Sequence, residues 1–253
     1  LSYFYEEDIR SMGIHRVKLY LTLITALLIT CITASCAGRQ DSGTVTDDKK
    51  IRAAVIDTGF SEKAIPAGNI AGGKNYVEGS MGTDDTYGHG TAVASIILEN
   101  APDTELVALV SSVYEHGRLK QVDADTFAGI IIDAVDVYGC DVINISAGFA
   151  ADVEAVRLAV EYAAQKGVVV VASAGNDYVE NPDVKYYPAA YDDVIAVGSM
   201  NESRTAISDF SQRGEWVDMY ECGENITVRT LSGDSREVSG TSYAAAGVTS
   251  KVC

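Results

Sequence analysis

Basic side chains are scarce in this sequence of 253 residues, which holds 19 lysines and arginines against 36 aspartates and glutamates. The formal net charge is therefore −17 at pH 7. Because proteins bind nucleic acid mainly by neutralising its phosphates with Lys and Arg, this balance argues against a nucleic-acid partner. We interpret the acidity as favouring solubility rather than the binding of a particular cationic partner.

Metal-binding patterns are also lacking. The sequence has three histidines and five cysteines, and these residues form no CxxC or Cys/His spacing that is typical of zinc. Cys140 lies next to an apolar stretch and is interpreted as a small buried hydrophobic residue. The residues themselves therefore predict no metal site.

No glycine-rich phosphate loop follows the first apolar run, residues 51–56, which argues against a nucleotide-binding domain of the flavodoxin type. Internal repeats are absent, and no linker divides the chain after residue 50. With 47% hydrophobic residues overall, the chain from residue 51 to residue 253 is expected to form one packed domain.

The residues before this domain resemble an export signal. Met12 opens a short basic segment, an apolar run of residues 19–32 follows, and Thr33-Ala34-Ser35-Cys36 ends the run with small residues. This order is typical of a secretory signal. We therefore expect an N-terminal extension and signal in residues 1–36, followed by a polar tether in residues 37–50.

The small residues before Cys36 resemble the lipobox of bacterial lipoproteins, in which the cysteine becomes lipidated and N-terminal. Thr33 stands where the lipobox usually has leucine. The alternative is an uncleaved membrane anchor, since the uncharged residues 19–35 are just short of the usual span of about 18–20 residues. Either interpretation predicts an exported chain held near a membrane, with Cys36 as the lipidation site in the first.

Strand and helix patterns alternate along the domain. Strands are expected at residues 51–56, 105–110, 142–146, 168–172 and 194–197, and amphipathic helices at residues 125–138 and 152–166. Gly139 and Gly167 fit helix C-caps, and residues 60–87 are expected to be loop. This alternation predicts an α/β fold with a mostly parallel sheet and helices on both of its faces.

Polar residues of three kinds stand at the ends of these elements. Asp57 ends the first strand, His89 lies between two glycines at a helix start, and Ser242 begins a helix of small residues. Of the other histidines, His15 lies in the signal region and His116 in a polar turn. Taken singly, Asp57 also fits a turn or capping residue, and Ser242 fits an ordinary N-cap.

Two strand exits consist of small residues, Ser146-Ala147-Gly148 and Ser173-Ala174-Gly175-Asn176. Such exits leave open space at the carboxyl edge of a parallel sheet, where ligands usually bind. Asn176 alone is equally consistent with a tight turn, because Asn tolerates left-handed backbone conformations.

The order Asp57, His89, Ser242 is the triad order of the subtilisin architecture. Together with the local motifs, it makes the chain resemble subtilisin-like serine peptidases, the subtilase family, over residues 51 to 250. Four motifs carry the resemblance: Asp57-Thr58-Gly59, Gly88-His89-Gly90-Thr91, Ser173-Ala174-Gly175-Asn176 and Gly240-Thr241-Ser242-Tyr243-Ala244.

The resemblance implies a role for each of these residues. Ser242 would attack the scissile carbonyl, His89 would act as general base and then acid, and Asp57 would orient the imidazole. Asn176 would donate a hydrogen bond to the oxyanion. Ser146, Ala147 and Gly148 would lie along the substrate, and Ser173, Ala174 and Gly175 would form the other wall of the first specificity pocket. Calcium is common in the family, but no complete set of ligands is identified here, so no cofactor is assigned.

The chain departs from the family pattern at the serine helix. Ala246 and Gly247 stand where the family usually has Pro and His, and family members generally continue beyond this helix. We therefore expect a C-terminally short subtilisin-like domain, as a fragment, a premature stop or a minimal member. Residues 37–50 are also too few for the folding pro-domain of many secreted relatives.

Two functions remain open from the sequence. The first is an exported, membrane-tethered serine endopeptidase that hydrolyses protein or peptide substrates through an acyl-enzyme. The second is a catalytically impaired relative that binds peptides in the cell envelope. Asp177, Glu180 and Asp183 follow the predicted oxyanion segment and are interpreted as solvated surface, with a preference for basic substrate side chains as the alternative.

Overall fold

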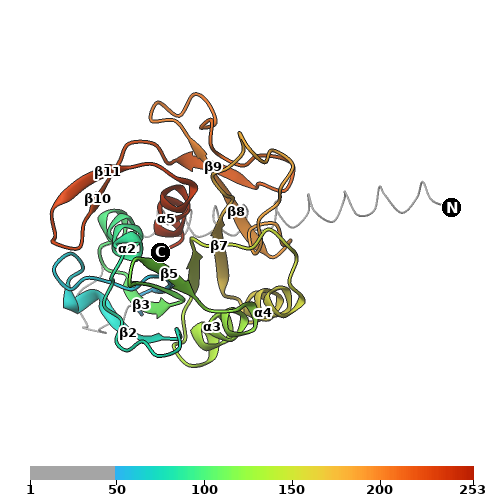
Figure 1. Cartoon of the computed structure of the whole chain (residues 1–253). Coiled ribbons are helices and arrows are strands. Elements are labelled where there is room, and N and C mark those ends of the chain that lie inside the picture. Colours follow the sequence, from blue (N-terminus) through green and yellow to red (C-terminus); the bar gives the residue numbers. More distant parts are fainter. Residues whose placement is uncertain (1–48) are drawn as a thin grey trace, which may run out of the picture. The chain divides into compact units, whose positions relative to one another are not determined.

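A seven-stranded parallel sheet organises residues 49–253, the part of the chain that the computed structural model describes (Figure 1). In spatial order its strands are β2 (Ile70–Asn75), β3 (Glu105–Val110), β1 (Arg52–Asp57), β6 (Val142–Ile145), β7 (Val169–Ser173), β8 (Val194–Met200) and β9 (Met219–Cys222). The predicted signal, its lipidation site at Cys36 and the tether up to residue 48 lie outside the described residues.

Helices cover both faces of the sheet, because its central strands are apolar on both sides. In β1, Ala53 and Val55 face one core, whereas Ala54 and Ile56 face the other. The first core contains residues of α2 (His89–Asn100) and α5 (Thr241–Val252), and the second contains residues of α3 (Ala124–Asp136) and α4 (Glu154–Gln165). Figure 1 shows the two pairs of helices on opposite sides of the strands. The predicted α/β architecture is confirmed.

The ends of α3 and α4 follow the local signals of the sequence. The side chain of Asp123 caps α3 by accepting a hydrogen bond from the Thr126 backbone N–H at 2.8 Å. Gly139 and Gly167, beyond the C-termini of α3 and α4, have φ angles of 59° and 79°. These left-handed conformations suit glycine and end the helices where the sequence predicts.

The prediction of loop throughout residues 60–87 was wrong, because β2 occupies Ile70–Asn75 within it. The segment carries two adjacent glycines and has no alternating apolar pattern, so it gives little strand signal. It forms a strand because it pairs with β3, with Gly73 packed against the β3 backbone. A Cβ atom at Gly73 would lie 2.5 Å from the carbonyl oxygen of Ala108.

Several short elements were also not predicted. They are the 3-10 helix η1 (Ala67–Asn69), β9 at the edge of the sheet, and two hairpins, β4 (Ser112–Glu115) with β5 (Arg118–Gln121) and β10 (Ile226–Arg229) with β11 (Ser235–Val238). Unlike the equally short β6, which is a continuous buried apolar run, these four-residue strands are largely exposed and carry no apolar run that marks them.

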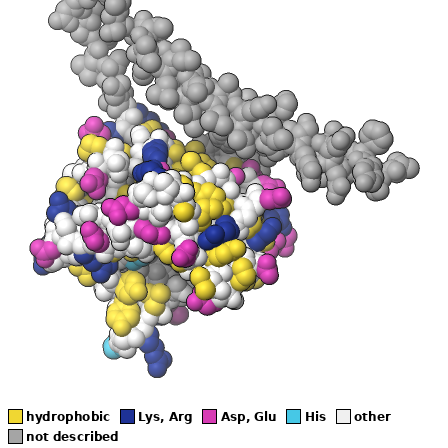
Figure 2. All heavy atoms as spheres, turned by 90° about the horizontal axis from the view of Figure 1, so that it is seen from above, with side chains coloured by type: hydrophobic (Ala, Val, Ile, Leu, Met, Phe, Trp, Pro, Cys, Tyr) yellow, Lys and Arg dark blue, Asp and Glu magenta, His cyan; other side chains and the backbone are white. Residues whose placement is uncertain are grey.

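The prediction of a buried Cys140 is confirmed, since only 4% of the residue is exposed. Its thiol is free, and burial raises its pKa to about 12. Between residues 49 and 253, no helix combines the length and the apolar character that crossing a bilayer requires. Acidic side chains are scattered over the face drawn in Figure 2 rather than gathered in one patch.

Candidate active site

The predicted site residues come from five separate elements. Asp57 is the last residue of β1 and His89 is the first residue of α2. Ser146 directly follows β6, Asn176 lies shortly after β7, and Ser242 is the second residue of α5. Because β1, β6 and β7 are parallel neighbours, their carboxyl ends lie at one edge of the sheet.

Asp57 and His89 form a direct pair. Nδ1 of His89 lies 2.8 Å from each carboxylate oxygen of Asp57, which is 4% exposed. The backbone N–H of Thr58 donates a further hydrogen bond to Asp57 Oδ1 at 2.8 Å. The carboxylate therefore fixes the orientation of the imidazole and favours the tautomer with its proton on Nδ1.

Gly90 allows α2 to begin this close to the end of β1. A Cβ atom at position 90 would lie 2.5 Å from the carbonyl oxygen of Gly59, which no side chain tolerates. The backbone N–H of Gly90 donates to Thr58 Oγ1 at 2.9 Å. The glycine beside His89 is thus required by the contact between the helix and the strand exit.

Asp85 holds the start of α2, and the sequence did not single it out. Its buried carboxylate accepts hydrogen bonds from the backbone N–H groups of Tyr87, Gly88 and Thr91 at 2.7–2.9 Å and from Thr91 Oγ1 at 2.7 Å. A carboxylate at a helix N-terminus is favourable because the first N–H groups lack helical partners. In the sequence, this capping role is marked by an aspartate four residues before the histidine that begins the helix.

Several groups act on the pKa of His89. Burial lowers this pKa, but the charge of Asp57, its hydrogen bond and the charge of Asp85 outweigh the effect of burial. The net result is a pKa above the ordinary value of about 6.5 for histidine. His89 is therefore a stronger base than a free imidazole.

Ser242 lies at the N-terminus of α5, where the positive end of the helix dipole favours negative charge. The helix begins at Thr241, one residue before the predicted start. Ser242 is 7% exposed. The ring of the next residue, Tyr243, lies with its centroid 5.7 Å from that of the His89 ring, so the start of α5 is beside the start of α2.

Asn176 is joined to the same helix start through Thr241. Its Oδ1 accepts hydrogen bonds from the backbone N–H of Thr241 at 2.8 Å and from Thr241 Oγ1 at 2.9 Å. Thr241 Oγ1 also accepts from the backbone N–H of Gly175 at 3.2 Å. These bonds leave the Asn176 Nδ2 group to donate, and the side chain is exposed. Thr241 thus positions the Asn176 side chain, a role that its sequence motif alone does not predict.

The exit of β6 reaches the other side of the same helix start. Ser146 Oγ lies 3.4 Å from the carbonyl oxygen of Ser242 and accepts a hydrogen bond from Asn144 Nδ2 at 3.1 Å. Asn144 Oδ1 in turn accepts from Thr249 Oγ1 at 2.8 Å. Both Asn144 and Thr249 are fully buried, so this chain of bonds fixes α5 against β6.

We expect Thr249→Val to lower the free energy of unfolding by about 1–3 kcal/mol, because it leaves the buried Asn144 Oδ1 without a donor while keeping the side-chain shape. Urea unfolding followed by circular dichroism measures the loss. Ser250→Ala is the matched control on the same helix, since its hydroxyl bonds to the helical carbonyl of Gly247. Equal stability of Thr249→Val and the native chain would show that the Asn144 contact does not anchor α5.

Ala246 and Gly247, which depart from the family pattern, are accommodated inside α5. The helix runs without interruption to Val252, and Ala246 is fully buried in the core that α5 shares with α2. Gly247 faces β9, since a Cβ atom there would lie 3.3 Å from Cγ of Glu221. The buried carboxylate of Glu221 forms ion pairs with Lys251 of α5 and with Arg204. The last turns of α5 are therefore fixed to the sheet by an ion pair as well as by apolar packing.

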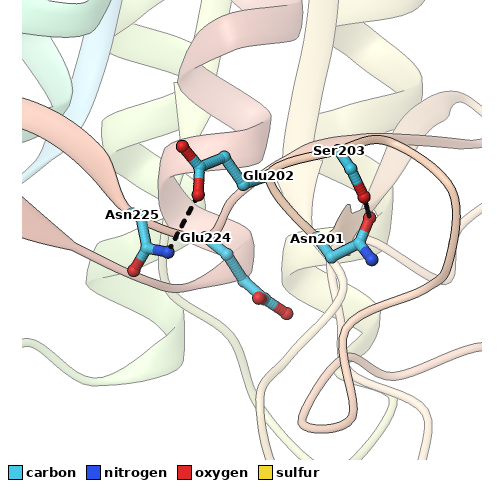
Figure 3. A pocket seen from close by; sticks show the side chains of 5 residues that line it. All are labelled: Asn201, Glu202, Ser203, Glu224 and Asn225. Carbon is cyan, nitrogen blue, oxygen red and sulfur yellow. Dashed lines mark hydrogen bonds between the residues drawn. The ribbon is translucent and has the colours of Figure 1, made fainter.

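A separate surface hollow of about 440 Å³ contains none of the predicted site residues. It is lined by Asn201, Glu202, Ser203, Glu224 and Asn225, and Figure 3 shows the hydrogen bond between Glu202 and Asn225, 3.3 Å long. Over residues 49–253, no three His, Cys, Asp or Glu side chains cluster as a metal site would require.

The chain matches the Subtilase family over residues 48–252. It is 34% identical over 215 residues to the major intracellular serine protease of Bacillus subtilis (strain 168), covering 78% of this chain and 65% of that protein. It is also 34% identical over 200 residues to the minor extracellular protease Epr of the same organism, covering 78% of this chain but 30% of Epr. The chain thus spans less than two thirds of the length of these relatives.

Among solved structures, a mutant of the protease domain of PatA matches with a TM-score of 0.67 and 28% identity. The match covers 79% of this chain and 76% of that domain. The family match over residues 48–252 agrees with two features of the structure. These are the parallel sheet with its helices and the Asp57–His89 pair beside the start of α5. The chain belongs to the subtilase family of serine proteases.

Proposed function

We propose that this chain is a serine endopeptidase that hydrolyses protein or peptide substrates through an acyl-enzyme. Ser242 Oγ attacks the scissile carbonyl, and His89 Nε2 takes the proton and later delivers it to the leaving amine. Asp57 holds the imidazole and stabilises its cation. The observation that carries this proposal is the placement of the Asp57–His89 pair beside the N-terminus of α5.

The geometry around Asn176 supports an oxyanion site. Nδ2 of Asn176 is free to donate because Oδ1 is held by Thr241, the residue directly before Ser242. The backbone N–H of Ser242 is the second proposed donor. Donors that are fixed in place before the reaction stabilise developing charge without the cost of reorienting.

A catalytically impaired, peptide-binding relative is the second candidate. Ala246 and Gly247, which stand behind the proposed nucleophile, favour it. One experiment distinguishes the two functions. The full chain is incubated with a library of internally quenched peptides. Turnover that continues for many cycles supports the peptidase. Saturable peptide binding without cleavage, by a folded sample, would support the impaired relative instead.

We expect kcat/KM for peptide hydrolysis to fall as the pH drops through the pKa of His89. The reason is that only the neutral imidazole can accept the proton of Ser242. Because Asp57 and Asp85 raise this pKa, the acid limb should have its midpoint above the ordinary histidine value of about 6.5. A pH profile of kcat/KM measures the midpoint, and a midpoint well below 6.5 would contradict the assignment of His89 as base.

We further propose that the chain is exported and tethered to a membrane by a lipid on Cys36. The support is the order of a basic segment, an apolar run and small residues before Cys36. The two relatives described above are named as intracellular and extracellular proteases, so they favour neither location.

The tether proposal predicts incorporation of an alkyne-labelled fatty acid into the native chain in a bacterial host. Cys36→Ser should abolish labelling and move the protein out of the detergent phase in Triton X-114 partitioning. Cys31→Ser is the matched control within the same region and should keep both properties. A native chain without label would contradict lipidation at Cys36.

A further inference from the structure

Two strand exits converge on the proposed nucleophile. Ser146, after β6, lies with Oγ 3.4 Å from the carbonyl oxygen of Ser242. Gly175, after β7, donates its N–H to Thr241 at 3.2 Å. If a substrate carbonyl lies on Ser242, the side chain of that substrate residue lies close to these two exits, which contain Gly148 and Gly175. Neither glycine fills that space with a side chain of its own.

Tyr186 lies against both glycines. A Cβ atom at Gly175 would lie 2.6 Å from Cδ2 and 3.0 Å from Cε2 of the Tyr186 ring. A Cβ atom at Gly148 would lie 3.6 Å from Tyr186 Cβ. The next residue, Tyr187, pairs with Phe149 through two backbone hydrogen bonds of 2.7 and 2.9 Å, which hold this segment beside the β6 exit.

The ring is fixed at its far end as well. The hydroxyl of Tyr186 donates to Asp177 Oδ2 at 2.6 Å. The same carboxylate accepts from Asn181 Nδ2 at 2.9 Å and from Nε2 of the fully buried Gln212 at 3.2 Å. Tyr186 is therefore held by its backbone on one side and by its hydroxyl on the other.

Asp177 is committed to this network rather than free to bind a substrate. Burial raises the pKa of its carboxyl, but the hydrogen bonds from Tyr186, Asn181 and Gln212 outweigh that effect and lower the pKa. The carboxylate thus stays an ionised acceptor for the Tyr186 hydroxyl, whose pKa this bond raises to about 12. Its charge is already used by three donors, which weakens the alternative of a preference for basic side chains.

We propose that Tyr186 is a specificity-determining residue that closes the pocket for the substrate side chain on the acyl side of the scissile bond. The pocket then accepts small side chains such as Gly, Ala and Ser and rejects Leu, Phe and Lys. This inference rests on the proposed peptidase function, since it takes Ser242 as the nucleophile.

The test compares peptides that differ only at this residue, with Ala, Leu, Phe or Lys in place. For the native full chain, we expect kcat/KM for the Ala peptide to exceed that for the Phe peptide at least tenfold. Tyr186→Gly should raise the ratio of Phe to Ala at least tenfold, since even one methylene too many or too few in a pocket changes discrimination by about 10–200-fold. Tyr186→Phe keeps the ring but loses the bond to Asp177, and should raise the ratio only a few-fold.

A binding assay keeps this inference separate from the proposed activity. In a Ser242→Ala background, fluorescence anisotropy of the same peptides should give the same order of affinities, and the added Tyr186→Gly change should improve binding of the Phe peptide relative to the Ala peptide. Thermal unfolding verifies that each variant is folded. A native preference for Phe, Leu or Lys, or a Phe-to-Ala ratio that Tyr186→Gly leaves unchanged in both assays, would overturn the role of Tyr186. A failure of Ser242 to react with a fluorophosphonate would overturn the peptidase instead.

Discussion

Replacement of Ser242 by alanine is expected to lower kcat for peptide hydrolysis by about 10⁶-fold, the magnitude established for the corresponding change in subtilisin itself rather than deduced from this structure. The physical reason is the loss of the atom that forms the acyl-enzyme. Stability should change little, because the Ser242 hydroxyl is not part of the Asn144–Thr249 anchor of α5. Steady-state kinetics with an internally quenched peptide measures the loss.

Ser250→Ala is the matched control for this variant. Ser250 lies on the same helix and its hydroxyl bonds to the carbonyl of Gly247 within the helix. Its replacement should leave kcat within a few-fold of the native value. Residual activity of Ser242→Ala near that of Ser250→Ala would mean that another group attacks the substrate.

Asp57→Asn is expected to lower kcat by about 10⁴-fold, as the equivalent change does in an unrelated serine protease fold. An asparagine amide would donate to Nδ1 of His89, which lies 2.8 Å from both oxygens of Asp57. The ring would then hold its proton on Nε2 and could not accept the proton of Ser242. The variant should keep its fold, because asparagine has nearly the same shape as aspartate.

The pH dependence of kcat/KM is a second measurement on the Asp57→Asn variant. Without the carboxylate, the pKa of His89 should fall, so the acid limb of kcat/KM should move to lower pH while the maximum stays far below the native one. Asp84→Asn, an exposed carboxylate in the loop before His89, is the control and should have a native profile. A native rate for Asp57→Asn would contradict the role of Asp57 as orienting group.

Much of the fold was readable from the sequence because its signals are local. The continuous apolar strands and the amphipathic helices α3 and α4 give clear patterns over four to thirteen residues. The glycines after these two helices mark their ends. Strand β2 could not be predicted, because its glycine-rich segment becomes a strand only through pairing with β3.

The site residues likewise fall into two groups, those that a sequence motif marks and those whose roles appear only in the folded chain. Asp57, His89, Asn176 and Ser242 were found because each lies in a short motif and the order of the motifs matches a known architecture. Asp85, Thr241 and Tyr186 were not found, because their roles depend on contacts that only the folded chain creates. Tyr186 is distant in sequence from Gly148, and no motif marks it.

Helix α5 is firmly anchored despite its departures from the family pattern. Ala246 and Gly247 depart from the family pattern in the helix behind Ser242, and this departure favours the catalytically impaired alternative. In the structure this helix is fixed by apolar packing with α2, by the Asn144–Thr249 bond and by the Glu221–Lys251 ion pair. These contacts give Ser242 a rigid support, which a preorganised nucleophile requires.

Active-site labelling tests the central claim most directly. The full native chain and its Ser242→Ala variant, both verified as folded, are treated with a fluorophosphonate and digested for peptide mapping by mass spectrometry. We expect stoichiometric phosphonylation of the native chain on Ser242 and no labelling of the variant. Absence of label on a folded native chain, or label on a residue other than Ser242, would contradict it.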